Sequence, residues 1–117
     1  MTEFAIILPI FCLLLFGIIQ LGIAFNNYLA LTDAVRAGAR YAAVDRRSST
    51  QCSDVQTKIK NSSSDLDQSK LNIPCPVSTW VPGEDVRVCA SYPYNINLLG
   101  MVVSSGNLNS CTTERVE

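Results

Sequence analysis

The chain has 117 residues, with 9 Lys and Arg against 10 Asp and Glu, no histidine and five cysteines. This length predicts one small unit rather than several domains. A net charge of −1 provides no basic face for nucleic acid. Without histidine there is no Ser–His or Cys–His nucleophile pair, and no glycine-rich phosphate loop is present. We therefore expect neither an enzyme nor a bound cofactor.

An unbroken apolar run, FAIILPIFCLLLFGIIQLGIAF, covers residues 4–25. About 20 apolar residues at roughly 1.5 Å each match a bilayer core of about 30 Å. A cleaved secretory signal would begin with basic residues, have a shorter apolar core and end in a small-residue cleavage site. The run therefore predicts a retained membrane-spanning helix. Because no Lys or Arg precedes it, we expect a basic leader to have been removed after insertion.

Glu3 is a carboxylate at the start of this apolar helix. One interpretation is an interfacial acid, favoured by the positive end of the helix dipole. The other requires that many copies pack their helices together, so that Glu3 becomes buried and must be neutralised. The α-amino group of Met1 on another copy is then the nearest positive charge. Such a pair would fix the axial offset between neighbours, because a wrong offset buries unpaired charges.

The helical pattern continues beyond the apolar run without a Gly-Pro break, which predicts one helix from about residue 2 to residue 46. Small residues recur four apart in its second half: Ala30, Ala34, Gly38 and Ala42. Such rows allow helix backbones to approach closely, either between copies or against the chain's own head. Gly17 and Gly22 are further candidates for helix packing.

Residues 47–117 form a polar head in which short elements are expected. A surface helix is predicted at 51–61, and 77–81 is at best an edge strand because prolines surround it. The clearest strand is 85–92, where apolar and polar residues alternate, and a last strand is predicted at 109–116. Between these two strands we expect a turn and a short apolar patch at 98–103.

Two single residues of the head deserve a hypothesis. Trp80 is expected to anchor the small core, since it is the one tryptophan of the chain. Asn61 begins an Asn-Ser-Ser sequence, which is a possible glycosylation site by pattern, although an ordinary loop asparagine is the alternative.

Four cysteines lie in the head and Cys12 lies in the apolar run, where it acts as a small hydrophobic residue. An even number in a small extracytoplasmic head indicates two disulfides. A metal site is disfavoured, because the spacings are long and histidine is absent. Antiparallel pairing of 85–92 with 109–116 would bring Cys89 to Cys111 and leave Cys52 for Cys75. The other two connectivities remain open from sequence alone.

The first 44 residues resemble the N-terminal signature of TadE-like proteins, pilin-like subunits of tight-adherence (Flp-type) pili in the type IV filament superfamily. The resemblance is carried by Glu3-Phe4-Ala5, Pro9, Phe16-Gly17 and the segment Ala37-Gly38-Ala39-Arg40-Tyr41-Ala42. The segments VRVCASYPY, LLG and ERVE of the head are also similar to the family's last strands, whereas 46–84 has no counterpart.

The resemblance implies removal of a leader by a prepilin peptidase, extraction from the bacterial inner membrane by the pilus assembly machinery, and packing with copies or related pilins. We therefore expect an α+β lollipop pilin: a long helix (1–46) in the membrane before assembly and in the filament core afterwards, and a disulfide-stapled head (47–117). Its role would be an extracellular pilus that serves adhesion or surface contact. The alternative is a monomeric single-pass envelope protein whose head binds a ligand or partner. That alternative does not explain why the helix continues for another twenty residues with a small-residue stripe.

Overall fold

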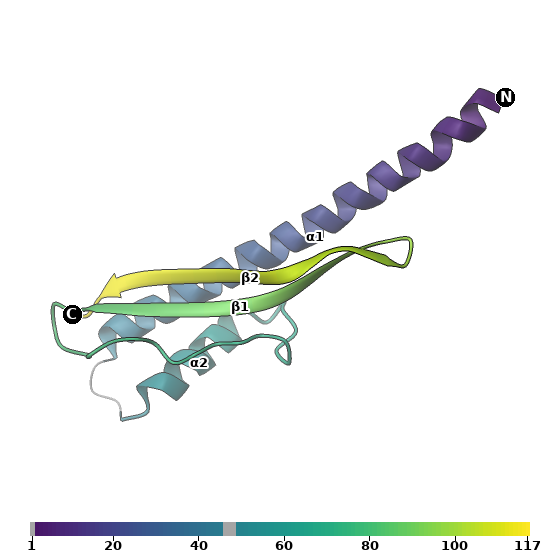
Figure 1. Cartoon of the computed structure of the whole chain (residues 1–117). Helices are drawn as coiled ribbons and strands as arrows, with labels where there is room; N and C mark the ends of the chain where they lie inside the picture. Colours follow the sequence, from purple (N-terminus) through teal and green to yellow (C-terminus); the bar gives the residue numbers. More distant parts are fainter. Residues whose placement is uncertain (1, 46–48) are drawn as a thin grey trace.

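A computed structural model describes residues 2–45 and 49–117 of the chain. The described part is elongated, with extents of 71 × 23 × 19 Å. Its elements in chain order are α1 (Thr2–Val44), α2 (Gln51–Ser62), β1 (Asp85–Leu98) and β2 (Met101–Arg115). Figure 1 shows α1 running the length of the molecule, with the other elements gathered at its C-terminal end. The predicted α+β class, a long apolar helix followed by a small head, is confirmed.

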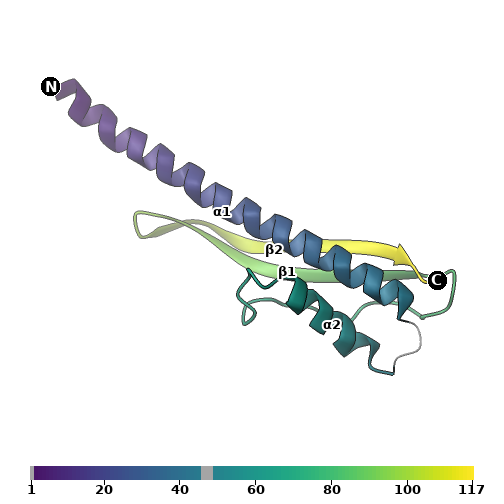
Figure 2. The ribbon, with the colours of Figure 1, turned by 180° about the vertical axis from the view of Figure 1, so that it is seen from behind.

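Helix α1 is continuous through Pro9 and ends at Val44. Its second half packs against α2 and both strands, while the tip of the hairpin reaches back beside its first half, as Figure 2 shows from behind. The residues of α1 that the head buries all lie in this second half: Leu31, Ala34, Val35, Gly38, Ala39, Ala42 and Ala43. The predicted boundary between the two parts, at 46 and 47, falls outside the described residues.

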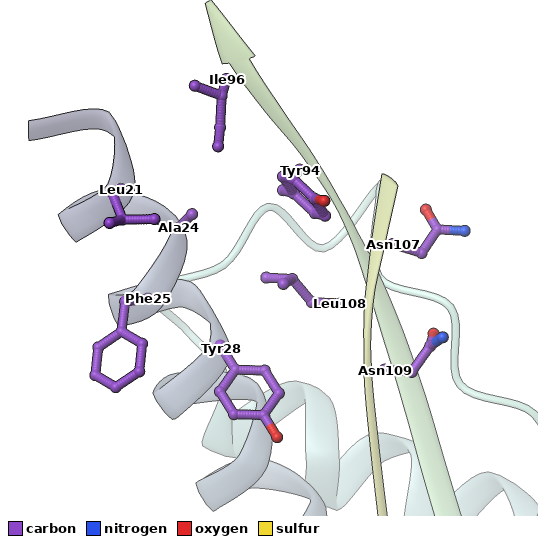
Figure 3. A pocket seen from close by; sticks show the side chains of 9 residues that line it. All are labelled: Leu21, Ala24, Phe25, Tyr28, Tyr94, Ile96, Asn107, Leu108 and Asn109. Atoms are coloured by element: carbon purple, nitrogen blue, oxygen red, sulfur yellow. The ribbon is translucent and has the colours of Figure 1, made fainter. Parts of the chain in front are cut away.

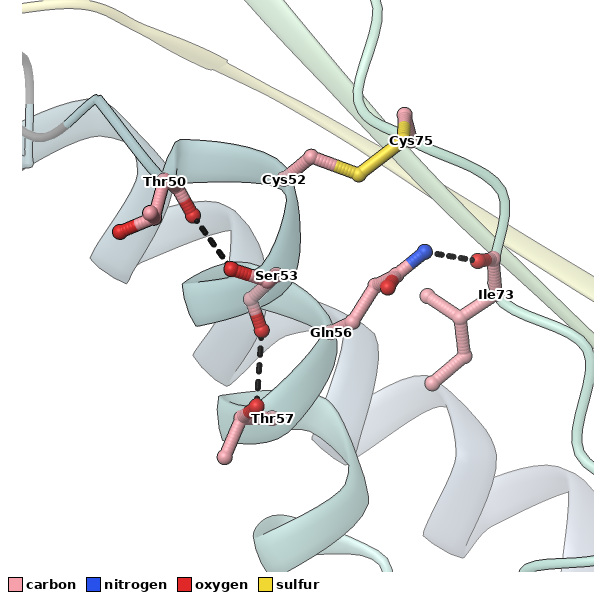
Figure 4. The surroundings of a disulfide bond; sticks show 7 residues. All are labelled: Thr50, Cys52, Ser53, Gln56, Thr57, Ile73 and Cys75. Carbon is pink, nitrogen blue, oxygen red and sulfur yellow. Dashed lines mark hydrogen bonds between the residues drawn. A yellow bond between two sulfur atoms is a disulfide. The ribbon is translucent and has the colours of Figure 1, made fainter.

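Helix α2 confirms the surface helix expected at 51–61. It is amphipathic, with Val55 and Ile59 fully buried against α1. Hydroxyl groups on its exposed side form hydrogen bonds to the backbone one turn earlier. The Ser53 hydroxyl donates to the Thr50 carbonyl (2.9 Å) and the Thr57 hydroxyl donates to the Ser53 carbonyl (2.8 Å), as Figure 4 shows. The short helix therefore has one face for the core and one for water.

Strands β1 and β2 form an antiparallel hairpin that lies along α1. Val86, Val88, Ala90 and Tyr92 alternate toward the core and are buried, as the sequence pattern predicted. The hydroxyl of Ser110 donates to that of Thr32 (3.2 Å), which joins β2 to α1 directly. The apolar face of the hairpin thus closes the core that α1 and α2 begin.

The hairpin is longer than predicted, and this corrects the expected turn and patch between the strands. Pairing continues from Asp85↔Arg115 to Leu98↔Met101, with one irregularity between Ile96 and Asn97. Residues 98–103 are therefore the tip of the hairpin. Its turn consists of Leu99 (φ 51°) and Gly100 (φ 85°), both left-handed as a two-residue hairpin turn requires. Leucine rarely adopts this conformation, so the sequence carried a weak turn signal.

The segment between α2 and β1 runs antiparallel beside β1 with little regular structure. Asn72 pairs with Ser91, and Val77 pairs with Arg87, as isolated bridges, so 77–81 is not a strand. Trp80 is only partly buried and packs at the margin of the core, which corrects its expected role as the anchor. The centre of the core is aliphatic and comes from α1, α2, β1 and the residue that follows β2: Leu31, Val35, Val55, Ile59, Val86, Val88 and Val116.

Candidate assembly surface on the stem

Residues 2–29 of α1, which we call the free stem, contain no buried residue. Large apolar side chains lie on all sides of it; Phe4 is 70% exposed, Leu14 56% and Leu21 63%. A helix that is apolar all round is stable only when lipid or protein surrounds it. Within the described residues the head covers none of this surface completely, so its cover must come from outside the chain.

Glu3 lies in the first turn of α1 and is exposed. A carboxylate here is favoured by the helix dipole, as the simpler sequence interpretation holds. The partner proposed for it, the α-amino group of Met1, lies outside the described residues. The register role of Glu3 stays a prediction.

The glycines of the free stem leave open space beside the helix. A Cβ built at Gly17 or Gly22 meets no other described atom within 4 Å. A neighbouring helix could approach closely at these two positions, so Gly17 and Gly22 stay predictions as packing sites.

The small-residue stripe of the second half is used within the chain. Ala34 and Ala42 are fully buried, and Ala30 packs at the edge of the core. Gly38 faces Ile59 of α2 so closely that a Cβ there would lie 2.8 Å from the Ile59 Cδ1 atom. The stripe therefore lets α1 approach its own head, which was one of the two alternatives that the sequence left open.

The four head cysteines pair as the strand alignment suggested. Cys89 bonds to Cys111 across a directly paired position of the hairpin, and Cys52 bonds to Cys75. Figure 4 shows that the second disulfide joins α2 to the segment that runs beside β1. A hydrogen bond joins the same two parts, because the Gln56 amide donates to the Ile73 carbonyl (2.7 Å). Cys12 is free and exposed on the free stem.

Two further predicted features can be placed. Asn61 lies exposed in the last turn of α2 rather than in a loop, and its modification stays a prediction. In the part of the chain that the structure describes, no group of three or more His, Cys, Asp or Glu could hold a metal ion.

A shallow groove separates α1 from the hairpin and marks where the head leaves the stem. In Figure 3, the side chain of Leu108 extends from the hairpin toward α1, while those of Asn107 and Asn109 point away from α1. The groove has an aliphatic and aromatic lining and no charged residue.

Of the helices in the described residues, α1 is long and apolar enough to cross a membrane, by length and composition. Residues 1–40 match the model of a family described as TadE-like protein. This segment of α1 is similar to that family. The match confirms the resemblance seen in the N-terminal signature and extends to Arg40, whereas the likeness of the last strands lies outside it. Comparisons with curated proteins and with solved structures gave no match.

The sequence predicts the apolar patch at 98–103 but not its place at the tip of a long hairpin. A further signal for this surface is that no charged residue occurs between Arg87 and Glu114.

Proposed function

We propose that the protein is a structural, non-enzymatic pilin-like subunit of a tight-adherence pilus. The free stem anchors it in the bacterial inner membrane and then packs against the stems of copies or related pilins in an extracellular filament. A prepilin peptidase and the pilus assembly machinery would carry out the transfer, and the filament would serve adhesion or surface contact. The observation that carries the proposal is the uncovered free stem within the TadE-like segment.

Energetics support an exchange of neighbours for this surface. Each large apolar side chain of the free stem is favourably placed in lipid and in a protein core alike, because both environments are apolar. The open positions at Gly17 and Gly22 favour close approach of another helix. Glu3 would then decide the offset between copies, since a carboxylate in an apolar contact is costly without a partner.

The alternative function, a monomeric membrane-anchored protein, gains from one observation. The small-residue stripe had argued against it, but Ala34, Gly38 and Ala42 contact the chain's own head. The length of α1 beyond the membrane run therefore follows from packing the head and does not distinguish the two functions. The filament is preferred because the matched segment covers the whole free stem and Glu3.

Sedimentation of the fibres sheared from intact cells distinguishes the two proposed functions. A filament subunit appears in the sheared pellet, and a membrane anchor stays with the cells. We expect Glu3→Leu to insert and fold normally but to lower the yield of sheared fibres at least tenfold, since about 1.4 kcal/mol per contact is a factor of ten. A matched control is Asp65→Asn, which removes an exposed head carboxylate.

Normal fibre yield from Glu3→Leu would remove the register role of Glu3. Absence of the wild-type chain from every sheared pellet would remove the filament itself and leave the anchor. Insertion and folding are checked in the same cells by membrane fractionation and by the intact disulfides.

A further inference from the structure

The tip of the hairpin, residues 98–103, is an exposed apolar patch at the end of a polar hairpin. Leu99 is 76% exposed, Met101 71%, and Val102 and Val103 62% each. The residues that follow on β2, Ser104 and Ser105, are exposed and polar. Soluble heads seldom end in such a patch unless it contacts something apolar.

The tip lies beside the free stem rather than beside water-facing parts of the head. Leu99 shares a cleft of about 180 Å³ with Pro9, Cys12, Leu13 and Phe16 of α1. All five residues that line this cleft are apolar or thiol-bearing. Figures 1 and 2 show the hairpin bending along α1 toward its N-terminus, with the tip standing off from the helix.

A polar belt separates this apolar end from the rest of the head. Gln20 and Asn27 of α1 line one hollow together with Lys70, Tyr94 and Asn95. Side chains of this kind, with tyrosine and lysine among them, are typical of the membrane–water interface. Cys12 lies beyond this belt by about 12 Å, or eight residues at roughly 1.5 Å each. Charge follows the same division, since none occurs between Glu3 and Asp33 or between Arg87 and Glu114.

We propose that, while the free stem is in the membrane, the hairpin tip enters the adjacent leaflet and contacts lipid acyl chains, with the polar belt at the headgroups. This inference rests on the membrane-anchored stage of the proposed function and not on polymerisation. It follows from continuity: a stem that spans the bilayer from about residue 4 to the belt places Leu99 on the hydrocarbon side of that belt. The subunit is then held at two points, which fixes the rotation of the head about the stem.

The cleft between Leu99 and α1 has a volume of about 180 Å³, and every residue that lines it is apolar or carries a thiol, which suits an acyl chain. A flexible hydrocarbon chain adapts to such a space without moving the hairpin.

The hairpin backbone limits how much of it enters. Both edges of a two-stranded sheet carry unpaired N–H and C=O groups, which hydrocarbon cannot satisfy. The exposed side chains of Asn95, Asn97, Ser104 and Ser105 begin directly behind the tip. Insertion is therefore confined to residues 98–103, and it takes Leu99, opposite Cys12, about 12 Å past the belt into a leaflet about 15 Å thick.

The test uses the full chain at one copy per phosphatidylcholine nanodisc. In a Cys12→Ser background, an environment-sensitive fluorophore is attached to Leu99→Cys, and quenching by phosphatidylcholine with a spin-labelled acyl chain is measured. Thr113→Cys, exposed on β2 at the other end of the hairpin, is the matched control, and Leu14→Cys reports the stem. The mass of each protein with one label verifies that both disulfides are intact.

We expect acyl-chain quenching at position 99 to be severalfold stronger than at 113 and to approach that at position 14. If position 99 is quenched by aqueous iodide as readily as 113 while 14 is protected, the tip lies in water and the inference is wrong, although the anchor stands. Loss of protection at 14 as well would overturn both. Protection at 99 that appears only with several copies per disc would assign the tip to a second copy and also contradict the inference.

Discussion

The two parts of α1, residues 2–29 and 30–44, are both rich in apolar residues, but their surroundings differ. Residues 30–44 alternate small and large apolar side chains with charged ones, and the head buries the apolar face. Residues 2–29 are apolar on every side, and no part of the described head buries them. Folding of the chain buries the apolar face of residues 30–44, whereas residues 2–29 are covered only by lipid or by another protein. One helix thus joins a folded domain to an exposed apolar surface.

The largest effect should come from truncating a leucine on each side of this division. Leu31 is 0% exposed, so Leu31→Ala should lower the free energy of unfolding of the head by about 2–5 kcal/mol. Leu14→Ala should leave it unchanged, because detergent fills the space in either case. Urea titration in micelles, followed by the fluorescence of the partly buried Trp80, measures both. Equal losses from the two variants would show that the free stem is part of the folded core.

A smaller effect is expected for the glycines. Gly38→Ala brings a Cβ against Ile59, whereas Gly22→Ala places it in open space. The gain in helix propensity is common to both and cancels. The difference in unfolding free energy should therefore report overpacking alone, about 1–3 kcal/mol in favour of Gly22→Ala. Equal stability in micelles would mean that α2 does not contact α1 as closely as the structure has it.

The smallest effect concerns the pH dependence of the second half. The Asp45 carboxylate raises the pKa of Tyr41 above its ordinary value near 10, with further contributions from desolvation and from Asp54. Because the folded pKa is raised, the contribution of Tyr41 to stability is complete below pH 10 and is lost as the pH rises through the folded pKa. Between pH 9 and 11, Tyr41→Phe should lose slightly less stability than the wild type in the same urea titrations. Identical slopes would contradict a change of pKa.

Much of the fold was readable from the sequence because its signals were local. The apolar run specified α1, the alternation from Val86 to Tyr92 specified the buried face of β1, and the alignment of the strands pointed to the Cys89–Cys111 pair. Each of these depends on periodicity or spacing within one element.

What could not be read depended on contacts between distant segments. The sequence did not decide whether the stripe around Gly38 faces a copy or the head, since small residues suit both; the contact with Ile59 decides it. The hairpin was predicted too short because Leu99 rather than Asn or Gly occupies its first turn position. Trp80 was misjudged because a left-handed backbone (φ 56°) places it at the margin of the core. The partner of the free stem lies outside the chain, so no single-chain structure identifies it.

The far end of the molecule has its own consequence. The backbone N–H of Glu117 donates to the carbonyl of Ala43 (3.1 Å), so the last residue is fastened where α1 finishes. Figure 1 places this terminus at the opposite pole from the N-terminus. An epitope or fluorescent peptide fused after Glu117 would emerge there, about as distant from the apolar run as the molecule allows. That position suits the attachment of cargo, since it keeps the cargo away from the exposed apolar surface of the free stem.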